Sequence, residues 1–409
     1  MLAIAVAGVL VVLHERDRDV TSTPESSPTT DVRATKARDR RVTDLLAQLT
    51  PALDDPRGLR DASALAAPAG VDRLRAIESN VRRIGITDLR LRYLGPSKRS
   101  ESATLQAAGS GEETWTADVR LSWRIGEYED TTSRLDLTMV VVDDDKQARF
   151  GGIVPGAEGD RVPIWLLQPL EVRKDERALV MASAKSRLRS LLQMANRAVE
   201  AVGRVLPDWR GSLVLEEPSD RGLLDQAIGA GSQVTTQLAG ITTTADGSAR
   251  RLAPEHVLLN PEVFDKLGPE AAQIVVSHEA THVATAGATA TMPQWLIEGF
   301  ADYVALRDLG VPVQTSASQI LAQVRRDGPP RRLPTDADFA GDSTELGADY
   351  EAAWLAAKLI ADRYGEQKLV EFYRATDDSG DIGKSFREIL GTTQRDFTRS
   401  WSAYVASLA

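Results

Sequence analysis

Two kinds of hydrophobic pattern follow one another along the chain, and the change falls near residue 183. Residues 41–182 begin with two segments of helical spacing, VTDLLAQLTPAL and GVDRLRAIESNVRRIG. They continue with segments in which apolar and polar residues alternate, which is the period of a half-buried strand. Helices followed by a meander of strands predict an α+β domain over this range. The alternation is clearest at Trp115, Ala117, Val119, Leu121 and Trp123.

The order of elements in residues 41–182 resembles the small cone-shaped folds similar to nuclear transport factor 2. This stretch carries no cluster of titratable side chains that would indicate a catalytic site. We expect a binding or spacer role for it, because a fold alone does not define a function.

Residues 183–409 predict a mainly helical domain with a small β-sheet. A long helix is expected from Ala184 to Val205, where apolar residues recur near helical spacing. Short strands are expected in GSLVLEE, TTQLAGITT and EHVLLN, and nearly everything after Pro269 has a helical pattern. The whole chain is therefore predicted to be of the α+β class, with two folded domains.

The N-terminus begins with thirteen apolar residues, MLAIAVAGVLVVL. A full membrane span needs about 20, and a cleaved signal would show a basic start and a small-residue cleavage site. We interpret residues 1–13 as part of a transmembrane anchor that continues upstream of Met1; the alternative is a hydrophobic arm of a soluble protein. Residues 14–40, rich in Ser, Thr, Pro and charge, predict a flexible linker. The folded part would then lie outside the cell membrane, held by a single span.

Composition narrows the possible chemistry. The formal net charge of the 409 residues is -10, and no long basic stripe is visible, which argues against nucleic acid as a partner. The chain has no cysteine, so disulfides and thiolate metal sites are excluded. A zinc site would have to use His, Asp and Glu, and the sequence contains four histidines.

Two of those histidines stand in one short motif, SHEATHV, at residues 277–283. His278 and His282 are four residues apart, so a helix places both imidazoles on one face within reach of one metal ion. Glu279 follows the first of them and can point toward a metal-bound water. The alternative is a chance occurrence of the pattern on a solvated helix.

A second helix, expected between Pro293 and Gly310, supplies further carboxylates. Glu298 lies sixteen residues after His282, and a helix, a short loop and a second helix would return it to the first. Two His and one Glu form a known catalytic zinc set. Asp302, one turn later, is placed to accept the second N–H of a ligand histidine. The alternatives are a surface carboxylate at Glu298 and a solvated helix charge at Asp302.

The segment HEATH followed by WLIEGFADY resembles the gluzincin peptidases, in particular the bacterial peptidase-MA-like proteins. The resemblance covers roughly residues 184–409 and implies a thermolysin-like domain with zinc held by His278, His282 and Glu298. It implies that Glu279 is the general base and later the general acid, and that Asp302 supports a ligand histidine. It also implies that residues 238–242 (LAGIT) line the substrate cleft, the alternative being an internal strand. Tyr350 is the nearest match to a tyrosine that stabilises the tetrahedral intermediate, the alternative being a core aromatic.

These observations predict a membrane-anchored zinc metallopeptidase whose partner is a peptide or protein substrate. One alternative is a catalytically silent protein that keeps the scaffold and only binds. Another is a tethered interaction module in which residues 41–182 carry the function. An aminopeptidase is disfavoured because LAGIT matches the glycine-rich exopeptidase motif poorly. Cleavage specificity and oligomeric state stay open.

Overall fold

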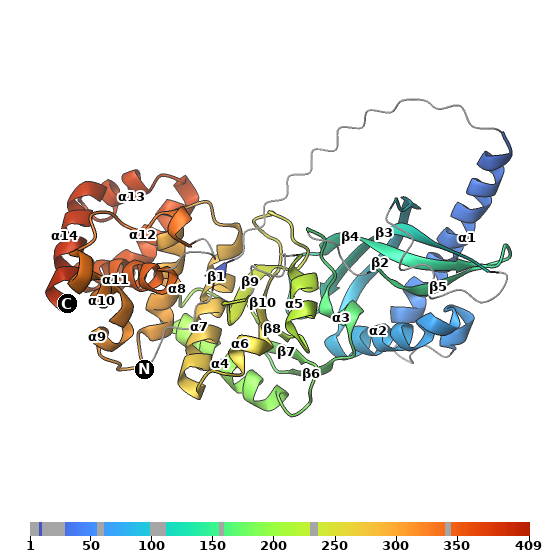
Figure 1. Cartoon of the computed structure of the whole chain (residues 1–409), viewed down its shortest axis with the longest axis horizontal. Helices are drawn as coiled ribbons and strands as arrows, with labels where there is room; N and C mark the ends of the chain where they lie inside the picture. The colour runs from blue at the N-terminus through green and yellow to red at the C-terminus, as the bar shows by residue number, and fades with distance from the viewer. Residues whose placement is uncertain are drawn as a thin grey trace.

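The computed structural model describes residues 8–9, 29–54, 61–98, 112–154, 159–229, 236–339 and 345–409. It is a mixed α+β structure with two sheets, and this confirms the predicted class (Figure 1). The helical C-terminal part lies at one end and the antiparallel sheet of the N-terminal part at the other (Figure 1). No helix among the described residues is long and apolar enough to cross a membrane. The expected anchor at residues 1–13 lies outside the described residues, except for Gly8 and Val9.

The N-terminal unit is an antiparallel four-stranded sheet in the order β2-β3-β4-β5, packed against helices. All five alternating apolar residues of β3 predicted to share one face are buried, which confirms that prediction. Its elements are α1 (Thr29–Asp54), η1 (Ala62–Ala64), η2 (Pro68–Gly70), α2 (Val71–Ile84), β2 (Ile86–Pro96), β3 (Glu113–Ile125), β4 (Ser133–Asp143) and β5 (Ala148–Ile153).

Helix α1 begins at Thr29, so the second part of the expected flexible linker, residues 29–40, is helical. The polar residues of this stretch are used in contacts with the sheet. The Arg38 guanidinium lies 3.9 Å from the centre of the Trp115 ring, and Arg38 pairs with Glu113 at 2.9 Å. The Tyr93 hydroxyl donates to Asp39 at 2.7 Å. Charge and polarity alone predicted a solvated linker, because they do not reveal a folded partner.

The second sheet has the order β1-β9-β10-β8-β7-β6. Strands β7, β8 and β10 run parallel to one another, whereas β9 pairs antiparallel with β10 and β6 pairs antiparallel with β7. The two-residue strand β1 pairs parallel with β9. The bounds are β1 (Gly8–Val9), β6 (Glu171–Lys174), β7 (Ala178–Ala182), β8 (Leu213–Glu217), β9 (Gly240–Thr244) and β10 (Glu255–Leu259).

The domain boundary expected at 182/183 is misplaced, because β6 and β7 belong to this second sheet. Strand β7 is buried on both faces: Ala178 and Val180 pack in the helical C-terminal core, and Leu179 and Met181 pack in the N-terminal core. A continuous apolar run is typical of such a strand. The sheet therefore joins the two cores.

Helices make up most of the remaining chain and enclose the C-terminal core. α4 and α7 contact the second sheet, and α8 packs against α7 and α11. The bounds are α3 (Ile164–Leu167), α4 (Leu188–Val205), α5 (Arg221–Ile228), α6 (Pro261–Phe264), α7 (Pro269–Thr285), η4 (Gly287–Thr289), α8 (Gln294–Leu306), α9 (Val313–Ser316), α10 (Ser318–Asp327), η5 (Asp336–Phe339), α11 (Leu346–Tyr364), α12 (Glu366–Ser379), α13 (Ile382–Glu388) and α14 (Gln394–Leu408).

A buried histidine links the two parts of the molecule. His256 on β10 lies 2.5 Å from Glu216 on β8 and 2.7 Å from Glu129, which follows β3 in the N-terminal unit. Burial alone would lower the pKa of His256, but its hydrogen bonds to the two carboxylates outweigh that effect and raise the pKa to about 10. His256 is therefore charged in the folded protein at neutral pH.

We expect this pairing to make stability depend on pH. The pKa of His256 is about 10 in the folded chain and near its ordinary value of 6.5 when unfolded. The stabilisation is thus complete below pH 6.5 and declines as the pH rises toward 10, by up to ~1.4 kcal/mol per pH unit. Urea unfolding of wild type and His256→Gln should show a difference in stability that shrinks across this window. A difference that is constant with pH would contradict the assignment.

Candidate metal centre

Helix α7 begins at Pro269, as the sequence predicts, because proline suits the first turn, where its missing N–H costs nothing. It ends at Thr285, and the next residue, Ala286, adopts a left-handed conformation with φ 53°. His278, Glu279 and His282 are buried on this helix, with at most 1% of their surfaces exposed. The motif therefore does not lie on a solvated face of the helix.

The link between the two helices is short and closely packed. A side chain at Gly287 would come within 2.9 Å of the His282 ring, so the turn back toward α8 needs a residue without a Cβ. Helix α8 then brings Glu298 and Asp302 beside α7, and both are buried, with at most 1% exposed. Neither carboxylate is the surface charge that the sequence left as the alternative.

Three ligand atoms converge, one from each of His278, His282 and Glu298, all within 4.8 Å of one another. The two histidine Nε2 atoms are 2.9 Å apart, and Glu298 Oε2 lies 3.0 Å from His278 Nε2 and 3.4 Å from His282 Nε2. Tetrahedral zinc with bonds of about 2.0–2.1 Å separates its ligands by about 3.3 Å. The donor set and its spacing therefore fit zinc.

Two further side chains orient these ligands. Asp302 Oδ1 lies 2.7 Å from His278 Nδ1, the contact that the sequence predicts. Gln294, one turn before Glu298, donates to Glu298 Oε1 at 2.6 Å. This leaves the Oε2 atom of Glu298 directed at the histidines. Burial alone would raise the pKa of Glu298, but the two histidines outweigh it and lower the pKa.

Glu279 is held against strand β9. The Thr242 hydroxyl donates to Glu279 Oε2 at 2.6 Å, whereas the buried Oε1 has no partner among the described residues. Burial raises the pKa of Glu279, which suits a carboxylate that must accept a proton. A side chain at Gly240 would come within 3.0 Å of Glu279 Cγ. The sequence places 238–242 at the cleft but assigns no role to Gly240 or Thr242.

Tyr350 on α11 lies beside the centre, with its ring centre 6.4 Å from that of His278. The ring also packs edge-on against Phe339 at 5.2 Å, and only 4% of the residue is exposed. Its hydroxyl makes no hydrogen bond within the part of the chain that the structure describes. Burial first, and then the nearby carboxylates Glu298, Asp302 and Glu279, raise its pKa well above the ordinary value. Tyr350 would therefore act only as a neutral donor.

Gly299, next to the ligand Glu298, allows close packing of α8 on α11. A Cβ at this position would lie 2.3 Å from the Ala353 carbonyl oxygen. We expect Gly299→Ala to lower stability by about 1–3 kcal/mol, as overpacking does, and to weaken zinc binding by displacing Glu298. Thermal unfolding with and without zinc measures both effects. Gly203→Ala is the control, since a Cβ within α4 meets nothing within 4 Å; equal behaviour of the two variants would contradict this account.

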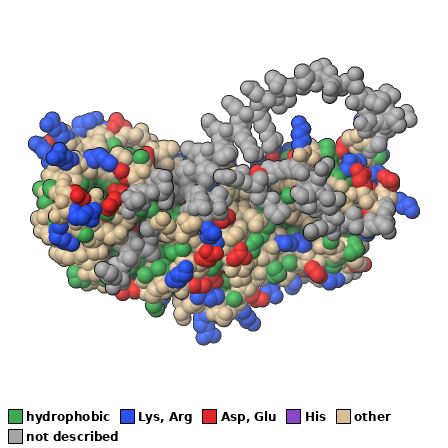
Figure 2. Space-filling view, in the orientation of Figure 1, with side chains coloured by type: hydrophobic (Ala, Val, Ile, Leu, Met, Phe, Trp, Pro, Cys, Tyr) green, Lys and Arg blue, Asp and Glu red, His purple; other side chains and the backbone are tan. Residues whose placement is uncertain are grey.

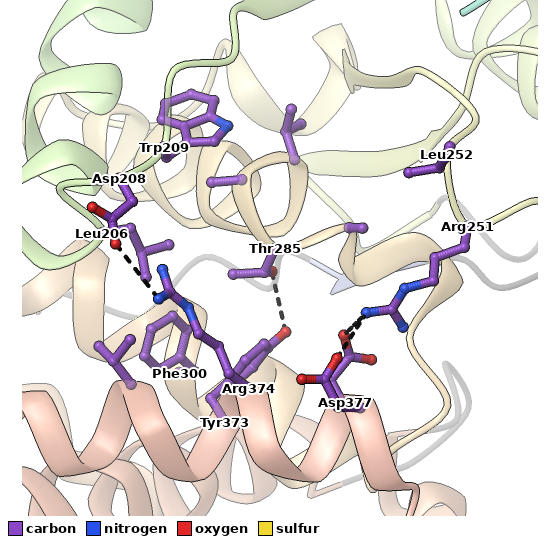
Figure 3. A pocket seen from close by; sticks show the side chains of 15 residues that line it. Leu206, Asp208, Trp209, Arg251, Leu252, Thr285, Phe300, Tyr373, Arg374 and Asp377 are labelled. Carbon is purple, nitrogen blue, oxygen red and sulfur yellow. Dashed lines mark hydrogen bonds and ion pairs between the residues drawn. The ribbon is translucent and has the colours of Figure 1, made fainter.

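A cavity of about 460 Å³ lies at the C-terminal end of α7 (Figure 3). Its charged side chains already pair with one another: Arg251 with Asp377 at 2.8 Å, and Arg374 with Asp208 at 3.7 Å. The Tyr373 hydroxyl donates to Thr285 at 3.1 Å across its floor. None of the three convergent ligands lines this cavity.

A scan of protein-family models and a search of curated protein sequences found no match to this chain.

Proposed function

We propose that this chain is a zinc metallopeptidase of the gluzincin type. The observation that carries the proposal is the convergence of His278, His282 and Glu298 on one point, with the carboxylate of Glu279 buried beside them. Two His and one Glu, with a fourth position left open, are typical of a catalytic zinc site rather than a structural one. The intact Glu279 favours turnover over a silent binding protein.

A bound zinc ion would activate a water molecule and polarise the carbonyl of the peptide bond. Glu279 would accept a proton from the attacking water on its Oε1 atom, which has no partner among the described residues, while Thr242 holds the other carboxylate oxygen. Glu279 then gives the proton to the leaving nitrogen as the C–N bond breaks, so that the products are a carboxylic acid and an amine. Tyr350, whose ring centre lies 6.4 Å from that of His278, would supply a hydroxyl donor for the developing oxyanion.

Strand β9 is the proposed support for the substrate backbone. Its Thr242 contacts Glu279, so a peptide along this strand passes the catalytic carboxylate. The pairing of Gly8 and Val9 with Ile241 and Thr242 supports this role, because it uses the edge of β9 opposite to β10. An extended peptide can add to such an edge through backbone hydrogen bonds.

The remaining parts of the proposal concern the setting of the enzyme. We propose that the N-terminal unit is a cone-shaped fold similar to nuclear transport factor 2, and its two long helices on a curved four-stranded meander support this (Figure 1). We also propose a thermolysin-like arrangement for the rest. The apolar residues at the start of the chain support a single membrane anchor with the peptidase outside; Gly8 and Val9 would then have to leave β9, with which they pair in this structure.

The test is cleavage of a mixed peptide library by the full chain loaded with zinc, analysed by mass spectrometry. We expect new termini to appear, to disappear after chelation and to return with zinc. A chain that binds zinc without cleaving any peptide would point to the silent binding protein. A chain that binds no zinc after reconstitution would overturn the proposal.

A further inference from the structure

A second feature lies at the N-terminal end of α8 and is not part of the metal centre. It is a groove of about 990 Å³ between the segment 331–336, the start of α8, α13 and the N-terminal part of α14. We call it the arginine groove. Five arginines and one aspartate line it, in a chain whose formal net charge is -10. The arginines are Arg331, Arg332, Arg387, Arg395 and Arg399.

The five arginines are not all neutralised. Arg332 pairs with Asp338, and Arg399 pairs with Asp396. Arg331, Arg387 and Arg395 are exposed, and none forms an ion pair with a residue in the described part of the chain. Lys and Arg side chains also gather on the surface at the end of the molecule that carries α13 and α14, with carboxylates among them (Figure 2). The groove therefore presents three exposed guanidinium groups that have no carboxylate partner among the described residues.

The floor of the groove is apolar. Trp295, Leu333 and Pro334 line it and are buried. The groove is far larger than a single phosphate or sulfate ion and matches the upper range of pockets for extended ligands. An apolar floor with an arginine rim suits a peptide that alternates apolar and acidic residues, because guanidinium groups bind carboxylates in a bidentate way.

Contacts connect the groove directly with the metal centre. Asp336, which lines the groove, accepts the backbone N–H of Gln294 at 2.9 Å, and the Gln294 side chain holds Glu298. Trp295 precedes Glu298 by three residues, which is about 5 Å along a helix axis. Gln294 therefore joins the groove to the ligand Glu298, through its backbone N–H on one side and its side chain on the other.

We propose that the arginine groove binds acidic segments of the protein substrate. This inference rests on the proposed function for the identity of the ligand. Recognition would be electrostatic and selective: acidic flanking residues would lower KM, and neutral ones would not. The two arginines that pair with aspartates would hold the edge of the groove in place. Arg331, Arg387 and Arg395 would bind the carboxylates of the ligand.

The test measures binding separately from turnover. The probe is a fluorescent twelve-residue peptide of alternating Glu and Leu, titrated with the full-length Glu279→Gln chain at low salt. The first variant adds Arg331→Ala, Arg387→Ala and Arg395→Ala. We expect this variant to bind the peptide at least tenfold more weakly. The loss would reach about 100-fold if each of the three arginines forms a full ion pair with a peptide carboxylate. The matched control adds Arg90→Ala, Arg92→Ala and Arg189→Ala, three exposed arginines far from the groove in the sequence, and should bind normally.

Two further binding measurements test whether the groove recognises the charge of the peptide. A peptide with Gln in place of Glu should bind weakly, and salt should weaken the binding of the acidic peptide. Equal affinity for both peptides, or equal loss in both triple variants, would overturn the proposal. Binding to vesicles with 30% phosphatidylglycerol but not to the peptide would also overturn it. Because the assay needs no cleavage, a failure of the peptidase proposal would appear only in turnover, and a failure of the groove only in binding.

Discussion

Replacing Glu279 with glutamine is expected to reduce peptide hydrolysis by roughly 100- to 10,000-fold, the contribution typical of general acid–base catalysis. Glutamine has nearly the same shape and can still accept the Thr242 hydrogen bond, which is 2.6 Å long in the wild type. It cannot take a proton from the attacking water. The three ligand atoms belong to other residues, so zinc content should stay at the wild-type level.

The measurement is kcat/KM for one peptide from the library, together with zinc content by mass spectrometry. Glu255→Gln is the matched control, because Glu255 is another buried glutamate, on β10, and burial raises its pKa to about 8. That residue is largely protonated at neutral pH, so the amide should change little. Activity that survives in Glu279→Gln would assign the proton transfer to another group. Activity lost equally in both variants would indicate general damage to the fold.

The convergence of side chains in the candidate metal centre was predictable because its residues follow local rules. The spacing of His278 and His282 has a meaning only on a helix, and the Pro269 start and apolar neighbours predict that helix. Glu298 and Asp302 were predicted in the same way, since a second helix after a short loop can return beside the first. Their burial and convergence agree with this reading.

The residues that support the centre from a distance were not predictable. Thr242 and Glu279 are 37 residues apart in the sequence, and their contact depends on how β9 packs on α7. Gly240 gives no signal of its own, because its role is the absence of a side chain where Glu279 approaches. Gln294 could have been found, since it stands one helical turn before Glu298.

The errors in domain organisation have a similar cause. The strands β6 and β7 precede the long helix α4 in the sequence and are the next strands after those of the N-terminal meander. Only the pairing of β7 with β8 assigns them to the second sheet. Likewise, residues 29–40 have the composition of a linker but form the first part of α1. Arg38 and Asp39 of this part contact side chains of the first sheet. Composition describes solvation and not tertiary contacts.

Substitutions of the proposed metal ligands are expected to have the second large effect. They should lower the affinity for zinc, each by an amount that depends on the role of the residue. Structural zinc sites bind with about 10–16 kcal/mol, so the loss of one of three protein ligands should weaken binding on the order of 1,000-fold. We expect this for His282→Ala and Glu298→Ala. Asp302→Asn keeps all three ligands and loses only the carboxylate next to His278, so a loss of about 10- to 100-fold is expected.

Thermal unfolding of the full chain at several zinc concentrations measures this order without any assay of activity. At a thousandfold excess over its dissociation constant, zinc stabilises the wild type by about 4 kcal/mol. The same concentration should hardly stabilise His282→Ala or Glu298→Ala, and Asp302→Asn should fall between them and the wild type. If zinc stabilised all variants as much as the wild type, it would bind elsewhere. If zinc did not stabilise even the wild type, the three convergent side chains would form only a buried polar network. The peptidase proposal would then fail.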